Sequence, residues 1–422
     1  MYPGVAARVP RPSCPARERL RRAGCAAAIA ACWMASARAQ TPTSLTLDEA
    51  LARALDANRT IQAARVGRAI DVAGIRVAGQ RPNPDVSVEE ARDAPHLAIA
   101  GAIPIEVAGK RGKRIAAAEA TLAVTEAEIV QTTVQVRSDV RRAYYQAVAS
   151  TRRLAIAQEL ETIAARLRDA ARDRFQTGAA PRLEQLQAEL ALAQAGNDTA
   201  SARGDLTASR AALNTLLAYP PDAAPALADP LEVGPLPTVA QATSLALTTN
   251  TELKVLERQI DEARARLALA QANRHPDPSV TGTLTYDAPG EFTFGWRAAV
   301  AVALPVFTTG KPEVAVAQAT LDRAIAQRDA RATQIAGDVA GAAARAASAR
   351  QALERYQTQI LPASVQVEQM AEESYRSGQT GLSALLQAVQ TAREIRQRAL
   401  QAGLEYQTAL ADLERAVGSP IR

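Results

Sequence analysis

Residues 46–58, TLDEALARALDAN, recur 192 positions later as residues 238–250, TVAQATSLALTTN. The same offset places Pro84-Asp85 on Pro276-Asp277. Further along, the offset changes to 200 and aligns four more pairs: Phe175 with Tyr375, Gly178 with Gly378, Leu213 with Leu413, and Pro220 with Pro420. A unit of this length is too long for a solenoid repeat. The sequence therefore predicts an internal duplication of one composite unit.

The duplicated unit holds a helical segment, an alternating segment, a very long helix, a glycine turn and another long helix. We expect a first repeat over 40–220, with helices near 45–79, 110–177 and 182–217 and strands near 85–107. A linker over 221–236 leads to a second repeat over 237–422. Its helices are expected near 237–273, 312–376 and 382–417, and its strands near 278–307.

The composition favours close-packed helices. Apolar residues make up 48% of the chain but aromatic residues only 3%, and alanine, the strongest helix former, fills the difference. Residues 1–39 hold seven arginines against one acid, which leaves 42 basic and 43 acidic residues in the rest. Nucleic-acid binding requires a basic surface. We therefore expect no nucleic-acid partner for the mature chain.

Residues 1–39 read as a signal peptide for export. An arginine-rich stretch precedes an apolar run from Ala23 to Ala35, and Ala37-Arg38-Ala39 offers small residues for cleavage. All three cysteines lie within this leader. A second reading stays open, because Ile29-Ala30-Ala31-Cys32 resembles a lipoprotein signal in which Cys32 would be acylated.

The helical segments are unusually long. No proline interrupts the chain from Gly109 to Gly178, a stretch that would span roughly 100 Å as one helix. Apolar residues recur there every seven positions, as in a coiled coil. The glycine at each turn predicts two antiparallel helical hairpins per chain. Pro362 must kink or break the long helix of the second repeat.

The segments between short and long helices alternate with period two, which indicates strands. Each repeat offers one β-hairpin, so one chain has four strands, too few to close a membrane barrel. An open strand edge in lipid is unfavourable, so several chains would pool their strands. A small amphipathic sheet resting on helices is the alternative. The predicted lipid face and aromatic girdle consist of Tyr286, Phe292, Phe294, Trp296, Val300, Val302 and Leu304.

Particular motifs resemble the TolC-like outer-membrane factors of efflux and type I secretion, over about Leu45 to Pro420. They are RFQTG at 174–178 followed by LEQLQA at 183–188, and YRSG at 375–378 followed by LLQA at 385–388. PIEVAGKR at 104–111 is most similar to the cobalt–zinc–cadmium (CzcC-like) branch, which serves heavy-metal efflux. This resemblance implies a mainly α fold with a small membrane β part: an α-barrel tunnel joined to a 12-stranded β-barrel shared by a homotrimer.

The resemblance also implies partners and sites. The trimer would lie in the outer membrane lipid, extend into the periplasm, and work with a periplasmic adaptor and an inner-membrane RND-type pump. A pore constriction is implied at Glu184 and Gln387, although some relatives have acidic residues where this chain has Ala384 and Gln387. The adaptor would dock on the periplasmic tips at Arg174, Phe175, Gly178, Leu186, Tyr375, Arg376, Gly378 and Leu385.

Little in the sequence indicates catalysis or the binding of a cofactor or metal. Gly109-Lys110-Arg111-Gly112-Lys113 lacks the first glycine and the Ser/Thr of a phosphate loop, so its basic residues read as membrane-boundary anchors or a solvated helix start. His96 and His275 are not in a ligand spacing, and no metal site or cofactor is expected. No catalytic set is apparent, so we expect no enzyme.

Three readings stay open. The first is a passive duct for heavy-metal cations. The second is a duct of the same kind for drugs or for a protein exported by type I secretion. The third is a periplasmic coiled-coil adaptor, which is disfavoured because adaptors usually present one helical hairpin and this chain carries two.

Overall fold

The structure is a computed structural model that describes residues 44–231 and 234–421. The described residues belong to one compact unit. The predicted leader over 1–39, with Cys32, lies outside them.

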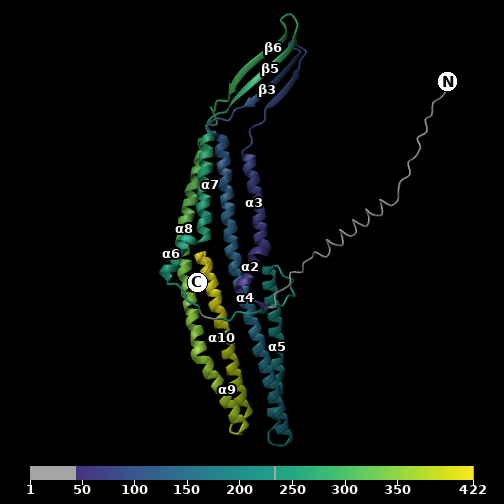
Figure 1. Ribbon diagram of the computed structural model, residues 1–422, viewed down its shortest axis with the longest axis vertical. Helices are drawn as coiled ribbons and strands as arrows, with labels where there is room; N and C mark the ends of the chain where they lie inside the picture. Colours follow the sequence, from purple (N-terminus) through teal and green to yellow (C-terminus); the bar gives the residue numbers. More distant parts are fainter. Residues whose placement is uncertain (1–43, 232–233, 422) are drawn as a thin grey trace, which may run out of the picture. The chain divides into compact units, whose positions relative to one another are not determined.

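Two similar series of elements follow one another along the chain, which agrees with the internal duplication (Figure 1). The first series is α2 (Leu47–Ala57), α3 (Arg59–Ala78), β2 (Asp85–Glu90), β3 (Leu97–Pro104), α4 (Lys110–Gln176) and α5 (Arg182–Leu217). The second is α6 (Val239–Thr249), α7 (Thr251–Asn273), β5 (Pro278–Ala288), β6 (Phe292–Val302), α8 (Lys311–Arg355), η1 (Tyr356–Ile360), α9 (Leu361–Arg376) and α10 (Leu382–Val417).

The helices expected near 45–79 and 237–273 are each two helices, so those predictions of one continuous helix are wrong. The break falls at Asn58 and at Asn250, which have extended backbones and cap the following helix through their side-chain oxygens. Each asparagine also donates from Nδ2 to a carbonyl of a distant helix, Leu216 at 2.9 Å and Ala416 at 2.7 Å. The break therefore anchors each short helix to the end of a long one.

The helix expected over 312–376 is interrupted, as the proline predicts. The π-helical turn η1 lies directly before α9, and Pro362 occupies the first turn of α9. Proline lacks an N–H and its ring crowds the preceding turn, so a local widening of the helix accommodates it.

The four longer strands form one antiparallel sheet in the order β2-β3-β5-β6. The register aligns Val88, Ile99, Leu284 and Trp296 in one row. Because side chains alternate between faces, the apolar positions of all four strands share one face, as the period-two pattern predicts.

A second, two-stranded sheet was not predicted from the sequence. The short strands β1 (Ser44–Leu45) and β4 (Ala226–Leu227) pair in parallel. Tyr144 of α4 is fully buried beside them, and its hydroxyl donates to the carbonyl of Leu45 or to Asp229, both at 2.8 Å. This sheet ties the segment between the repeats to the centre of α4.

The two repeats pack against each other through the second half of the first repeat. Strand β3 pairs with β5, and α4 contacts α7 near the sheet and α10 further along (Figure 1). Helix α4 also contacts α3 and α5 of its own repeat. Among the helices that the structure describes, none is both long and apolar enough to cross a membrane.

Candidate channel-forming surfaces

The first candidate surface is the apolar face of the sheet. Trp296 is 75% exposed, and Phe294 and Val300 on the same face are also exposed. The opposite face carries small and polar residues, among them Thr281, Thr283, Thr285, Ala299 and Arg297. A strand wall between lipid and water has this one-sided composition. Of the predicted girdle, only Leu304 lies beyond a strand, because β6 ends at Val302.

The sheet has two open edges. In the described part of the chain, β2 pairs only with β3, and β6 pairs only with β5. An unpaired edge exposes a row of backbone N–H and C=O groups that lipid cannot satisfy. The sheet of a single chain is therefore incomplete as a membrane-spanning structure.

The second candidate surface is the pair of helical hairpin ends, here called the first tip (174–188) and the second tip (375–388). Gly178 and Gly378 adopt the same left-handed conformation, with φ of 74° and 72°. Each glycine N–H donates to the carbonyl three residues earlier, Phe175 or Tyr375. The two turns are thus built alike, as the repeated glycine predicts.

The tips differ in how their aromatic residues are placed. Tyr375 is only 7% exposed and Leu385 only 2%, and both pack with Ala171 of α4 and Ala188 of α5. Phe175, by contrast, is 39% exposed and Leu186 is 50% exposed. The predicted docking residues thus divide into buried ones, which hold the two tips together, and accessible ones on the first tip.

The remaining predicted tip residues are charged or polar. Arg174 lies over the Tyr375 ring, while Arg376 is exposed and pairs with Glu372 of its own helix. Glu184 lies half-buried in the first turn of α5, and Gln387 is exposed on α10. Their assignment to a pore constriction stays a prediction.

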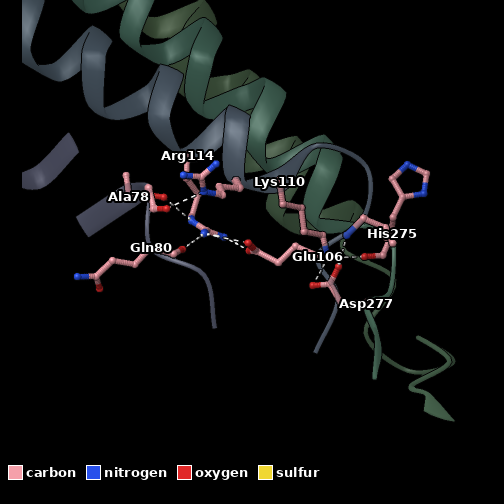
Figure 2. Close-up of polar contacts among 10 residues, drawn as sticks. Ala78, Gln80, Glu106, Lys110, Arg114, His275 and Asp277 are labelled. Carbon is pink, nitrogen blue, oxygen red and sulfur yellow. Dashed lines mark hydrogen bonds and ion pairs between the residues drawn. The ribbon is translucent and has the colours of Figure 1, made fainter. Parts of the chain in front are cut away.

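The third candidate region is the junction between the sheet and the helices (Figure 2). Lys110, the first residue of α4, points its Nζ to Asp277 at 2.8 Å and to the carbonyl of His275 at 2.6 Å. Asp277 also accepts from the backbone N–H of Val107 at 2.9 Å. The Lys110 side chain is only 9% exposed. It is therefore not a solvated helix start but a buried link between the repeats.

Arg114 completes this junction (Figure 2). It pairs with Glu106 and donates to the carbonyls of Ala78 and Gln80 at the end of α3. Cations stabilise the C-terminal ends of helices. The pair with Glu106 raises the pKa of Arg114. The contacts in Figure 2 thus fix the start of α4 against the end of α3 and the end of α7.

No group of three or more His, Cys, Asp or Glu side chains that could hold a metal is found within the described residues. His96 lies in the β2–β3 connection, where its Nδ1 is 3.2 Å from the carbonyl of Ala91. His275 contributes its backbone carbonyl to the Lys110 contact. Neither histidine is brought to a second one by the fold.

A duplicated helical hairpin joined to a sheet with one apolar face defines the class of outer-membrane efflux channel proteins. The family profile described as outer membrane efflux protein matches residues 50–218 and 242–419, once for each repeat. The chain therefore belongs to this family, and it is a protein of the outer membrane.

Individual relatives agree with this assignment. The cobalt-zinc-cadmium resistance protein CzcC of Cupriavidus metallidurans is 26% identical over 384 residues, covering 89% of this chain and 90% of the relative. The solved structure of CusC superimposes with a TM-score of 0.73 at 18% identity, covering 88% of this chain and 92% of that one. The outer membrane channel CmeC of Campylobacter jejuni gives 0.74 at 17% identity, covering 88% and 85%. These structures confirm the TolC-like fold.

Proposed function

We propose that this protein is the outer-membrane duct of a tripartite efflux system and that its cargo is heavy-metal cations. Three copies close one 12-stranded barrel, and their helical hairpins continue as a tunnel toward the periplasm. An inner-membrane RND-type pump supplies the energy, a periplasmic adaptor connects pump and duct, and this chain has no enzymatic role. Residues 1–39 are removed on export.

The observation that carries this proposal is the four-stranded sheet with one apolar face and two open edges. Four strands cannot close a barrel, and unpaired edges are unfavourable in lipid. Sharing the sheet among copies satisfies both requirements, and the TolC-like resemblance gives the number three.

Support for the cargo comes from the likeness to CzcC, a protein named for cobalt, zinc and cadmium resistance. The described residues offer no cluster of metal ligands. We therefore assign the choice of ion to the pump and a passive role to this chain. A duct for drugs is the second candidate, because solved structures with this fold match the chain at only 17–18% identity, so the fold alone does not specify the cargo.

The assembly is tested by cell fractionation and by the native mass of the purified protein in detergent. A trimer recovered from the outer membrane supports the proposal, whereas a detergent-free periplasmic monomer contradicts it and favours the adaptor reading. The cargo is tested by deleting the gene and comparing tolerance to cobalt, zinc and cadmium with tolerance to drugs. Unchanged metal tolerance with increased drug sensitivity would replace the metal assignment with the drug one.

A further inference from the structure

Because the two repeats are built alike, the contact between them inside one chain has an equivalent that a single chain cannot form. Inside the chain, β3 and α4 of the first repeat contact β5 and α7 of the second. On the outer sides, β6 and α8 of the second repeat are equivalent to β3 and α4, and β2 and α3 of the first repeat are equivalent to β5 and α7. They have no such partner in the described chain, because β2 and β6 are the two edges of the sheet.

Both residues of the Lys110–Asp277 ion pair at the inner contact have equivalents on the outer sides. Asp277 corresponds to Asp85, since Pro276-Asp277 and Pro84-Asp85 follow the repeat offset. Lys110 corresponds to Lys311: each is the first residue of a long helix, directly after a left-handed glycine with φ of 67° or 66°. The sequence thus supplies the same acid and the same base a second time.

The two pairs differ in their surroundings. Lys110 is buried and lies 2.8 Å from Asp277. Asp85 and Lys311 are both exposed, and neither side chain has an ion-pair partner among residues 44–231 and 234–421. Asp85 lies on one edge strand of the sheet and Lys311 begins the helix that follows the other edge strand, so a single chain does not bring them together.

We infer that Lys311 of one copy forms an ion pair with Asp85 of the neighbouring copy and that this pair repeats the Lys110–Asp277 contact between chains. The inference rests on the proposed function, because it takes the copies to join with β6 next to β2.

Helices α3 and α8, which would meet where two copies join, also have exposed apolar residues. Val66, Ile70 and Val77 form an exposed apolar stripe on α3, and Val316 is exposed on α8. Ile70 is equivalent by the repeat offset to Glu262, which accepts from the hydroxyl of Thr121 on α4. The face of α3 that corresponds to the inner contact is therefore apolar, as expected for a surface covered by a second copy.

The pair would fix the register between copies. Asp85 begins the edge strand β2, and Lys311 begins α8, the next element after the edge strand β6. A slip of one residue between paired strands would exchange their faces, so a charge pair at the base of the two edge strands favours the pairing that keeps the apolar face continuous.

Charge reversal tests this inference. Lys311→Glu or Asp85→Lys alone is expected to lower the fraction of trimer that survives mild heating in detergent on the order of tenfold, because each places like charges at three equivalent seams. The double reversal is expected to restore the trimer. Lys113→Glu, at an exposed lysine in the second turn of α4, is the matched control and should leave it unchanged.

A cysteine pair gives a second readout in a mature chain that has no other cysteine. Asp85→Cys with Lys311→Cys is expected to give dimers and trimers linked between chains by a short bismaleimide. Lys110→Cys with Asp277→Cys, the equivalent pair, is expected to link only within a chain. A stable trimer that tolerates both single reversals and forms no interchain link would overturn this inference alone. A wild-type protein that is monomeric would overturn the proposed assembly as well.

Discussion

The guanidinium carbon of Arg174 lies 5.2 Å from the centre of the Tyr375 ring, so the first residue of one tip covers the first aromatic of the other. Tyr375 is buried, and its hydroxyl has no hydrogen-bond partner within the described residues. A buried hydroxyl without a partner is unfavourable, whereas a ring beneath a cation is favourable. The ring, rather than the hydroxyl, therefore joins the two tips.

Removing the hydroxyl should consequently be harmless, and removing the ring should not. We expect Tyr375→Phe to match or slightly exceed the stability of the wild type, and Tyr375→Ala to cost about 3–5 kcal/mol locally because it leaves a cavity. Hydrogen exchange of the 371–389 segment measures the difference. Arg376→Ala, next to it but exposed, is the control. Equal exchange in Tyr375→Ala and the wild type would show that the tips do not depend on this contact.

The accessible aromatic of the first tip predicts where an adaptor binds. Phe175→Asp is expected to weaken binding of the adaptor at least tenfold, because it puts a charge into an apolar contact, while trimer formation stays unchanged. Gln176→Asp, at the exposed neighbouring position, controls for the added charge. Binding of the two variants to the adaptor in detergent is compared. If both bind alike, docking does not involve Phe175.

Much of the fold follows from the sequence, because its strongest signals are periodic. The bounds of α5 and α10 agree with the expected 182–217 and 382–417, where long alanine-rich stretches end at glycine or proline. The sheet face follows from period two alone. The helix breaks at Asn58 and Asn250 are not predictable from the local pattern. An asparagine within a helical pattern marks a boundary only when its side-chain amide donates a hydrogen bond to the carbonyl of a distant residue.

The candidate surfaces were only partly predictable. Phe175 and Tyr375 occupy equivalent positions, yet one is accessible and the other buried, because the two tips pack against each other from different sides. The repeated sequence therefore does not show which of the two aromatic side chains is exposed. The buried pair of Lys110 and Asp277 was missed as well, although the repeated Pro-Asp dipeptide was a signal for it. Asp277 of this dipeptide meets Lys110 only because β3 pairs with β5, and no local sequence pattern specifies that pairing.

The one-sided sheet predicts opposite effects for adjacent residues. Val300→Lys places a charge on the apolar face and is expected to cost up to about 2–4 kcal/mol, the range for a lysine at the middle of the membrane. Ala299→Lys places the same charge on the opposite face and should be tolerated. The amount of each variant recovered in the outer membrane checks this. Equal recovery would contradict the assignment of the apolar face to lipid.

The junction pair predicts a response to acid. Burial alone would raise the pKa of Asp277, but hydrogen bonds from Lys110 and the Val107 N–H, together with the charges of Lys110 and Arg114, lower it. The contribution of the pair is therefore fully present above about pH 4 and is lost as the pH falls through the lowered pKa of the folded state.

Lys110→Met should remove most of this acid response, because the carboxylate loses its main partner. We also expect it to destabilise the protein by about 1–3 kcal/mol at neutral pH. Thermal unfolding in detergent at neutral and acidic pH measures both effects, with Lys113→Met as the control. An acid response that is the same in Lys110→Met and the wild type would remove Asp277 as its source.

The buried tyrosine of α4 predicts a response to alkali. Burial raises the pKa of Tyr144, and the hydrogen bond and charge of Asp229 raise it further, against the lowering effect of the Asp229 backbone N–H. Since the folded state holds this proton more tightly than the unfolded state, its contribution is complete below about pH 10 and is lost as the pH rises toward the raised pKa.

Tyr144→Phe separates the hydroxyl from the ring. It removes the contacts to Leu45 and Asp229 and is expected to lower the free energy of unfolding by about 1–3 kcal/mol at neutral pH. The difference from the wild type should shrink in alkali, because only the wild type loses the contribution of a tightly held proton. Tyr219→Phe is the control, since the Tyr219 hydroxyl makes no hydrogen bond in the described part of the chain. Unfolding measured from neutral pH to about pH 11 tests this, and a constant difference across the series would show that Tyr144 does not sense alkali.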